Sequence, residues 1–322
     1  MNMQIGLKQI LLPLLLAFAT ATPVIADDAK TPSLPLTIAE NDDGFLVSED
    51  GKPVLQYQLR TKSLNNKWPR NNYIHPLYNL DGEVITEDFP DDHKHHRGIF
   101  WAWHQVTAGD VRLGDSWLCK DFIWEIESSE ASRNDGGSAA LATQLVWKSP
   151  ALVGPGGNPI AVVRERTTIT VHPVANAHRS IDFDIRLKAL LPNVKIGGSE
   201  DAKGYGGFSP RIKLSKDQVF RSSTGKLKPK KLPIKAGPWM DVSNSSWGLT
   251  ILTHPANPGF PEPWILRSQR SMQNAAYPGA SSITLPTELE THLRYRLVIH
   301  RGAQSRIDFA EQQERFAQST KN

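Results

Sequence analysis

Short runs of alternating apolar and polar residues, separated by glycine and proline, dominate this chain. Glycine and proline each occur 23 times in 322 residues, and the runs between them are rich in valine, isoleucine, threonine and aromatic residues. This spacing is typical of antiparallel strands joined by turns. The run Ile181–Leu187 illustrates it, because Asp182 and Asp184 would face away from its apolar side chains.

The turn chemistry points to the same fold class. Gly44–Val47 and Val54–Tyr57 flank an Asp50-Gly51 pair and predict a hairpin. Further strands are expected at 141–147, 162–171, 181–187, 247–252 and 293–299. One helix is expected, from Ile307 to Gln318 with Ser305 as its N-cap. We therefore expect an all-β fold, a large antiparallel β super-sandwich of two stacked sheets with a short C-terminal helix.

Residues 1–26 have the pattern of a secretory signal peptide. Lys8 supplies the positive charge, residues 10–19 form an apolar segment, and Val24-Ile25-Ala26 provides a small-residue cleavage site. The apolar segment is shorter than the roughly 20 residues that span a bilayer, and no later apolar run is long enough. We expect an exported protein, periplasmic or secreted, in which residues 27–322 form a single β super-sandwich domain without a membrane partner.

Charge and cysteine content limit the classes of partner. The formal net charge is +4, and much of the excess lies in Lys226-Leu227-Lys228-Pro229-Lys230-Lys231. We interpret this run as a solvated loop. A basic face with interleaved aromatic residues is not evident, so we expect no nucleic-acid partner. Cys119 is the only cysteine, which excludes an intrachain disulfide.

Histidine is concentrated in the stretch Asp91-Asp92-His93-Lys94-His95-His96-Arg97-Gly98. Imidazole transfers protons or binds metals near neutral pH. On a strand, His93 and His95 would project to one face and His96 to the other. Acid–base chemistry or substrate binding, a metal site and a structural loop all remain open interpretations. We predict no cofactor, but a divalent metal is possible, with His93, His95 and His254 as its ligands.

Two further segments carry candidate binding residues. In Lys203–Arg211, three glycines allow close approach to a ligand, Tyr205 could stack on a sugar, and Arg211 could bind a carboxylate or hydroxyls. A tight turn is the alternative. In the proline-rich segment from His254 onward, a stiff loop would present His254, Glu262 and Trp264, with Arg267 just after it.

Other side chains near these segments are expected to complete one pocket. Glu165 lies between two arginines on a predicted strand, where a solvated ion pair is the alternative. The additional pocket residues are His75, Arg97, Trp101, His104, Asp115 and Glu165.

Several motifs together resemble one family of secreted bacterial proteins. They are Tyr73-Ile74-His75-Pro76, Asp88-Phe89-Pro90, Asp92-His93-Lys94-His95-His96-Arg97-Gly98, Tyr205-Gly206-Gly207-Phe208-Ser209-Pro210-Arg211, His254-Pro255-Ala256-Asn257-Pro258 and Tyr295-Arg296-Leu297-Val298-Ile299-His300-Arg301-Gly302. The family is catalogued as PmoA-like, or "methane oxygenase PmoA", and the resemblance extends from about residue 40 to 316. A copper oxygenase subunit would need membrane helices, which this sequence does not contain.

The family looks similar to super-sandwiches of the galactose-mutarotase type, which bind sugars in an open groove. That resemblance implies that His95 and His96 face the sugar, with Arg97, Arg211 and His254 around them. The glutamate base of mutarotases has no firm match, although Glu262 and Glu288 are candidates.

These observations predict an exported carbohydrate-active protein, an enzyme acting at or near a glycosidic or anomeric carbon. The reaction would be that of a hydrolase, lyase or epimerase and would use histidine and carboxylate acid–base chemistry. We expect His95, His96, Glu262 and His254 to be the catalytic residues. The alternatives are a carbohydrate-binding protein without catalysis and a histidine-ligated metal-dependent protein.

Overall fold

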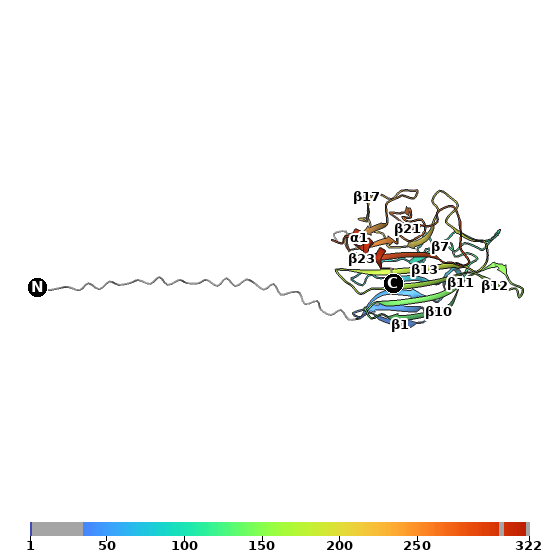
Figure 1. The fold of residues 1–322 in the computed structure, drawn as a ribbon, viewed down its shortest axis with the longest axis horizontal. Coiled ribbons are helices and arrows are strands. Elements are labelled where there is room, and N and C mark those ends of the chain that lie inside the picture. Colours follow the sequence, from blue (N-terminus) through green and yellow to red (C-terminus); the bar gives the residue numbers. More distant parts are fainter. Residues whose placement is uncertain (2–34, 303–305, 320–322) are drawn as a thin grey trace. The chain divides into compact units, whose positions relative to one another are not determined.

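The computed structural model describes Met1 and residues 35–302 and 306–319. The predicted signal peptide and the predicted cap Ser305 lie outside these described residues. The described residues from 35 onward belong to one compact unit, in which strands dominate (Figure 1). The prediction of an all-β antiparallel fold with a short C-terminal helix is confirmed.

One large sheet contains eight strands in the described part of the chain. In spatial order they are β1 (Thr37–Asn41), β2 (Gly44–Glu49), β3 (Lys52–Gln58), β6 (Tyr73–Leu77), β7 (Ile99–Trp103), β15 (Gly206–Pro210), β21 (Asn274–Ala276) and β20 (Trp264–Ile265). Neighbouring strands are antiparallel throughout, as in the β7–β15 pair. We call it the first sheet.

The second sheet contains nine strands among the described residues. In spatial order they are β10 (Ile123–Arg133), β11 (Ala139–Val153), β12 (Pro159–Val171), β13 (His178–Ala189), β23 (Thr291–Arg301), β19 (Trp247–Thr253), β18 (Trp239–Ser243), β16 (Val219–Ser222) and β17 (Gly225–Leu227). The segments expected to be strands at 141–147, 162–171, 181–187, 247–252 and 293–299 all lie in this sheet.

Two smaller sheets complete the strand inventory of the described residues. One contains β22 (Ile283–Thr284), β14 (Val194–Gly197), β8 (Gln105–Ala108) and β9 (Val111–Arg112), and the other pairs β4 (Lys62–Leu64) with β5 (Lys67–Arg70). β8 follows β7 almost directly, so the four-stranded sheet continues from an end of the first sheet.

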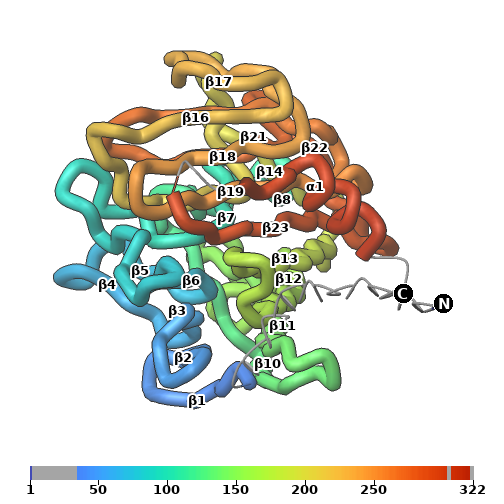
Figure 2. The backbone as a smooth tube through the Cα atoms, turned by 90° about the vertical axis from the view of Figure 1, so that its left-hand side faces the viewer, coloured from blue at the N-terminus to red at the C-terminus, as the bar shows by residue number. Residues whose placement is uncertain are grey.

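The main core lies between the first and second sheets. Phe208 of β15 stacks on Tyr295 of β23 with ring centroids 4.5 Å apart, and it meets Phe183 of β13 at 4.9 Å. In Figure 2, the strands β2, β3 and β6 of the first sheet lie on one side and β10 to β13 of the second sheet on the other. All three rings are buried, and burying one such side chain contributes about 1.5–3 kcal/mol. The prediction of two stacked sheets is confirmed.

The predicted hairpin forms between β2 and β3. Asp50 has φ of 51° and Gly51 has φ of 74°. Positive φ at both central residues is the requirement of a type I′ turn, whose twist matches that of the strands.

The C-terminal helix α1 (Phe309–Gln318) begins after Asp308. The carboxylate of Asp308 accepts hydrogen bonds from the backbone N–H groups of Ala310 and Glu311, so Asp308 is the N-cap where Ser305 had been expected. Phe316 packs with Leu252 and Val298 and fixes α1 on the second sheet. Within the described residues, α1 lacks the length and apolar character that a membrane-crossing helix needs.

Candidate functional site

β7 presents its two sides to two different clusters of buried side chains. Ile99, Trp101 and Trp103 belong to the main core, whereas Phe100 and Ala102 face the opposite side of the first sheet. The cluster on that side, which we call the Trp117 cluster, comprises Tyr73, Phe100, Ala102, Trp117 and Met272, with Tyr205 packed against it. It forms the floor of the candidate site on the outer side of the first sheet.

The histidine stretch is a tight turn before β7 and not a strand. The N–H of His93 donates to the carbonyl of Pro90 at 3.2 Å, and the N–H of His96 donates to that of His93 at 2.9 Å. The rings of His93 and His96 stack with centroids 4.6 Å apart, and the ring of His95 lies 4.6 Å from that of His96. The turn therefore brings all three imidazoles together, whereas a strand would have separated them.

His95 and His96 are held in their neutral form. His96 is 3% exposed and lies against Phe100 and Trp117, with ring centroids 6.0 Å away in each case. Burial, assisted by the neighbouring histidines and arginines, lowers the pKa of His96 far below its usual value. Burial and the same kind of neighbours lower the pKa of His95 to about 4. Neutral imidazole offers both a donor and an acceptor to a ligand.

Two carboxylates orient His104 and His93, the histidines that lie near His95 and His96. Asp115 Oδ2 lies 2.8 Å from His104 Nδ1, and Asp92 Oδ2 lies 2.7 Å from His93 Nδ1. Because a carboxylate only accepts hydrogen bonds, each Nδ1 is assigned the hydrogen, and each Nε2 is left to exchange protons. The ring of His104 also stacks on Trp117 at 5.3 Å.

Two buried guanidinium groups lie beside the imidazoles. Arg211 donates to Glu87 Oε2 at 2.7 Å and to Asp92 Oδ1 at 2.8 Å, and its Nη1 is 3.4 Å from His96 Nδ1. Arg70 Nη2 donates to the carbonyl of Ser116 at 2.5 Å. The Nε of Arg70 is buried without a hydrogen-bond partner among the described residues. Both arginines help to keep His96 neutral.

Tyr205 and Arg267 close another side of the candidate site. The ring of Tyr205 lies 5.7 Å from that of Trp117, and its hydroxyl accepts a hydrogen bond of 2.5 Å from Arg267 Nη2. The structure thus brings together eight of the predicted site residues and Asp92, which adjoins them. The eight are His93, His95, His96, His104, Asp115, Tyr205, Arg211 and Arg267.

Arg97 is part of the scaffold. It is fully buried, forms an ion pair with Asp88, and donates to the hydroxyl of Tyr73 at 2.5 Å and to the carbonyl of Trp68 at 2.9 Å. This contradicts the expectation that Arg97 contacts substrate, because its donors are already engaged within the protein. His75 is half-buried, and its Nδ1 contacts the Thr86 hydroxyl at 3.0 Å.

Glu165 and Trp101 lie between the sheets and not in the candidate site. The indole N–H groups of Trp101 and Trp147 donate to the two oxygens of Glu165 at 2.7 and 2.8 Å, and Asn72 adds a bond of 2.7 Å. Glu165 is fully buried, and burial raises its pKa. It joins the two sheets, so neither the expected solvated ion pair nor the expected pocket residue is observed.

His254, Glu262 and Trp264 also lie elsewhere. The ring of His254 packs 5.1 Å from Phe316 of α1, and Glu262 is 1% exposed, with Oε1 bonded to Asn257 at 3.0 Å. Trp264 is fully buried and donates to the carbonyl of Gly237. The proline-rich segment therefore turns these side chains inward, which contradicts their expected place beside the histidine turn. The carboxylates that face the imidazoles are Asp92 and Asp115.

The described residues were expected to include a possible metal site at His93, His95 and His254. Among the described residues, no group of three or more histidine, cysteine, aspartate or glutamate side chains has the arrangement to hold a metal ion. The set His93, His95 and His254 is split, since His254 packs on α1.

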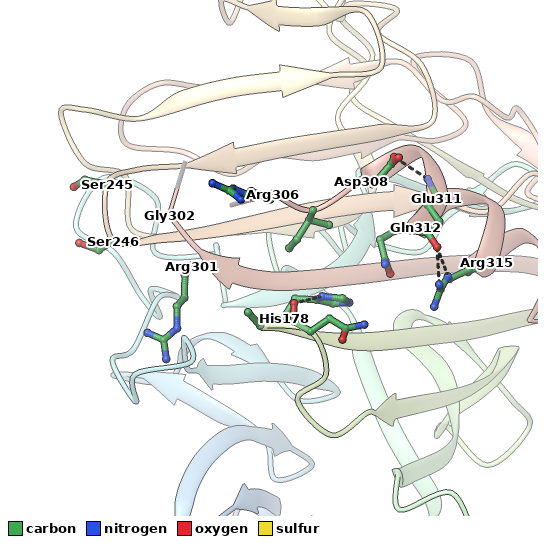
Figure 3. A pocket seen from close by; sticks show the side chains of 13 residues that line it. His178, Ser245, Ser246, Arg301, Gly302, Arg306, Asp308, Glu311, Gln312 and Arg315 are labelled. Atoms are coloured by element: carbon green, nitrogen blue, oxygen red, sulfur yellow. Dashed lines mark hydrogen bonds and ion pairs between the residues drawn. The ribbon is translucent and has the colours of Figure 1, made fainter. Parts of the chain in front are cut away.

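Two cavities are relevant to the candidate site: a groove beside the histidine turn and a pocket beside α1. Asp92 and Arg211 line a groove of about 1040 Å³ next to the histidine turn. Another pocket, of about 480 Å³, lies between α1 and the end of β23 (Figure 3). There Arg315 is paired with Glu311, and His178 is the sole histidine among the described lining residues. None of the residues predicted for the functional site lines that pocket.

Arg70 and Trp117 belong to the candidate site but are not among the site residues predicted above. Arg70 ends the sequence Lys67-Trp68-Pro69-Arg70, which reads as an exposed turn, yet the guanidinium is 1% exposed and lies 5.0 Å from the ring of Phe100. Its contacts with Ser116 and Phe100, which are distant in the sequence, place Arg70 at the candidate site. Trp117 had a signal, because it lies close to Asp115 in the sequence.

The comparisons with known proteins identify a family. A model described as "Family of unknown function (DUF6807)" matches residues 45–313, and no curated protein matches the chain. Among solved structures, that of "a putative mutarotase (YeaD) from Salmonella typhimurium" aligns with 83% of this chain and 94% of that chain, at 9% identity and a TM-score of 0.38. This likeness is too weak to carry an argument, and no comparison supports the methane-oxygenase name. Because the matched residues cover most of the sequence, the chain belongs to the DUF6807 family of unknown function.

Proposed function

We propose that the outer side of the first sheet binds a carbohydrate and transfers a proton to or from it. The observation that carries this proposal is the pairing of His104 with Asp115 at 2.8 Å, stacked on Trp117 and beside the neutral His95. The His104 side chain is partly exposed, and an imidazole oriented in this way, with its Nε2 available, is suited to general acid–base chemistry on a sugar.

The state of the carboxylates favours proton transfer over a nucleophilic mechanism. Asp115 uses Oδ2 for His104 and accepts the N–H of Leu118 at Oδ1. Asp92 is bonded to His93 and to Arg211. A glycosidase would need two carboxyl groups across the bond that is cleaved, one of them free to attack or to activate water. Lyase or epimerase chemistry, with imidazole as base and acid, agrees better with these contacts.

The remaining groups are suited to binding. Neutral His95, which is partly exposed, can donate and accept a hydrogen bond with sugar hydroxyls. The guanidinium of Arg70, which has no carboxylate partner among the described residues, provides positive charge that would stabilise an enolate-like intermediate formed when a proton leaves carbon. An exported location and a carbohydrate substrate remain part of this proposal.

The test is solvent exchange. Purified protein would be incubated in D₂O with a panel of neutral sugars, uronates and their oligomers, while NMR follows deuterium at carbon and absorbance follows unsaturated products. We expect exchange or elimination on one substrate class, and a loss of about 10²–10⁴-fold in His104→Gln.

The matched control is His292→Gln, since His292 also forms a pair with an aspartate, Asp184, at 2.7 Å, but on the second sheet. It should keep full activity. Binding without exchange would show that the protein only binds carbohydrate, and release of reducing ends without exchange would indicate hydrolysis. Either result would overturn the proton-transfer mechanism.

A further inference from the structure

The lysines of the basic run at 226–231 are exposed, as expected for a solvated segment, but the end of the run is anchored to the protein. Arg267 Nη1 donates to the carbonyl of Lys230 at 2.9 Å, and Arg267 Nη2 donates to that of Lys231 at 3.1 Å. The same Nη2 donates to the hydroxyl of Tyr205. These bonds fix the end of the run beside the aromatic ring that packs on the Trp117 cluster.

A buried side chain anchors this arrangement from below. Gln273 is fully buried. Its Oε1 accepts from the backbone N–H of Arg267 at 3.0 Å, and its Nε2 donates to the carbonyl of Arg267 at 2.9 Å. The position of Arg267 is therefore set by the core of the protein, and not by a flexible surface chain alone.

The hollow between these groups is strongly cationic. It has a volume of about 310 Å³, and its described lining includes four cationic side chains and no carboxylate. The four are Lys203, Lys230, Lys231 and Arg267. Lys203 is paired with Asp201 at 3.0 Å, whereas the other three have no ion-pair partner within the described residues. Uncompensated positive charge around a concave surface attracts anions.

A chain of packed aromatic rings connects the hollow to the histidine site. The ring of Tyr205, which lines the hollow, is 5.7 Å from that of Trp117. Trp117 in turn is 5.3 Å from the ring of His104 and 6.0 Å from that of His96. Trp117 and His96 are buried, so a ligand that reaches both the hollow and the imidazoles would pass over the partly exposed rings of Tyr205 and His104.

We infer that this hollow is a subsite for an anionic group, a carboxylate or a sulfate ester, on the carbohydrate that the histidine site takes. The inference rests on the proposed function, because it assumes that a carbohydrate occupies the histidine site. It adds that the ligand is acidic and longer than one sugar ring. Lysine and arginine at the hollow supply charge-assisted hydrogen bonds to the anionic oxygens.

The experiment compares affinities of two double variants of the full-length protein. Lys230→Gln/Lys231→Gln removes two charges from the hollow, whereas Lys226→Gln/Lys228→Gln removes two exposed charges from the same run outside it. The probes are polygalacturonate for carboxylates, heparin for sulfate esters and a neutral glucan, each at low and high salt. We expect wild type to bind one acidic polymer and not the glucan, with affinity falling as salt rises. The first variant should bind roughly tenfold more weakly, and the second should bind as wild type does.

Other outcomes would overturn the inference. Equal weakening by both double variants would show that net charge alone, and not the hollow, attracts the polymer. A different result would be tight binding of the neutral glucan, lost in His104→Gln but unchanged in Lys230→Gln/Lys231→Gln. This would contradict the anionic subsite and leave the proposed function standing. If no carbohydrate binds at all, both are overturned.

Discussion

The outer sides of the two large sheets carry polar residues in opposite ways. On the second sheet, charged groups bind one another: Arg296 of β23 forms an ion pair with Asp182 of β13 at 2.5 Å, and Asp184 of β13 binds both His292 of β23 and Arg186 of its own strand. On the first sheet, His95 and His96 are stacked together and kept neutral. On the second sheet these polar groups bind one another, and we call it the closed face. On the first sheet the neutral His95 keeps a donor and an acceptor beside the paired groups, and we call it the open face.

The difference shows which polar groups are engaged in holding the fold. Pairing across β13 and β23 matches the register of the strands, as Asp182 lies directly opposite Arg296. Such groups have little capacity left for a ligand. On the first sheet the partly exposed imidazole of His95 is kept neutral beside His96, so it retains a donor and an acceptor. This difference favours a binding function for the first sheet.

The largest effect should come from the scaffold beneath the histidine turn. Arg97→Met would leave the partly buried carboxylate of Asp88 without its partner. We expect the free energy of unfolding to fall by about 3–5 kcal/mol, as measured by urea denaturation. A loss below about 1 kcal/mol would mean that this pair resembles the exposed pairs of the second sheet.

Matched aspartates should separate the two faces by activity. Asp115→Asn keeps the shape of the side chain but removes the charge that orients His104. We expect its turnover in the exchange assay to fall by at least about a hundredfold, with a smaller change in KM. Asp184→Asn alters the equivalent pair with His292 and should leave turnover unchanged. Equal losses would contradict the assignment of the site to the first sheet.

The pH dependence of stability should also differ between the faces. The pKa of His95 is lowered by burial to about 4 in the folded protein, against about 6.5 in the unfolded chain. Between these values the unfolded chain binds a proton that the folded protein does not. Stability is therefore present above about pH 6.5 and is lost as the pH falls to about 4.

Removing His95 should flatten that part of the curve. Relative to wild type, His95→Gln should retain on the order of 2 kcal/mol more stability at pH 4, measured by urea unfolding at several pH values. Asp184 supplies the contrast. Although burial opposes it, hydrogen bonds from His292 and Arg186 hold its pKa at about 2, so Asp184→Asn should alter stability above about pH 4 and lose that effect as the pH approaches 2. If both variants changed stability over the same pH range, the two faces would not differ in pH dependence.

The fold was accessible from sequence because its determinants are local. Alternation in Ile181–Leu187 and the Asp50-Gly51 turn each act over a few residues, and both predicted elements formed. The histidine turn was also found from sequence, since its members are adjacent. Its conformation was not, because the bond from His96 to the carbonyl of His93 cannot be read from composition.

The rest of the site depends on contacts between distant segments. Glu165, between two arginines, was predicted to line the pocket, but Trp101 of the first sheet and Asn72 just before β6 hold it between the sheets. Glu262 looked like the missing carboxylate, but its loop turns inward. Asp115 is held close to His104 by the local course of the chain. Burial and partner choice, which decide chemical roles, are tertiary properties.

The smallest effect should come from an exposed pair on the second sheet. Arg186 binds Asp184 at 2.8 Å, and the side chains are 44% and 31% exposed. Because water screens such a pair and ordering the side chains opposes it, Arg186→Gln should lower the free energy of unfolding by only about 0–1 kcal/mol. Urea denaturation at low and high salt would measure this, and turnover should match wild type. A loss as large as that in Arg97→Met would show that charges on both faces support the fold equally, which would end the distinction between a closed and an open face.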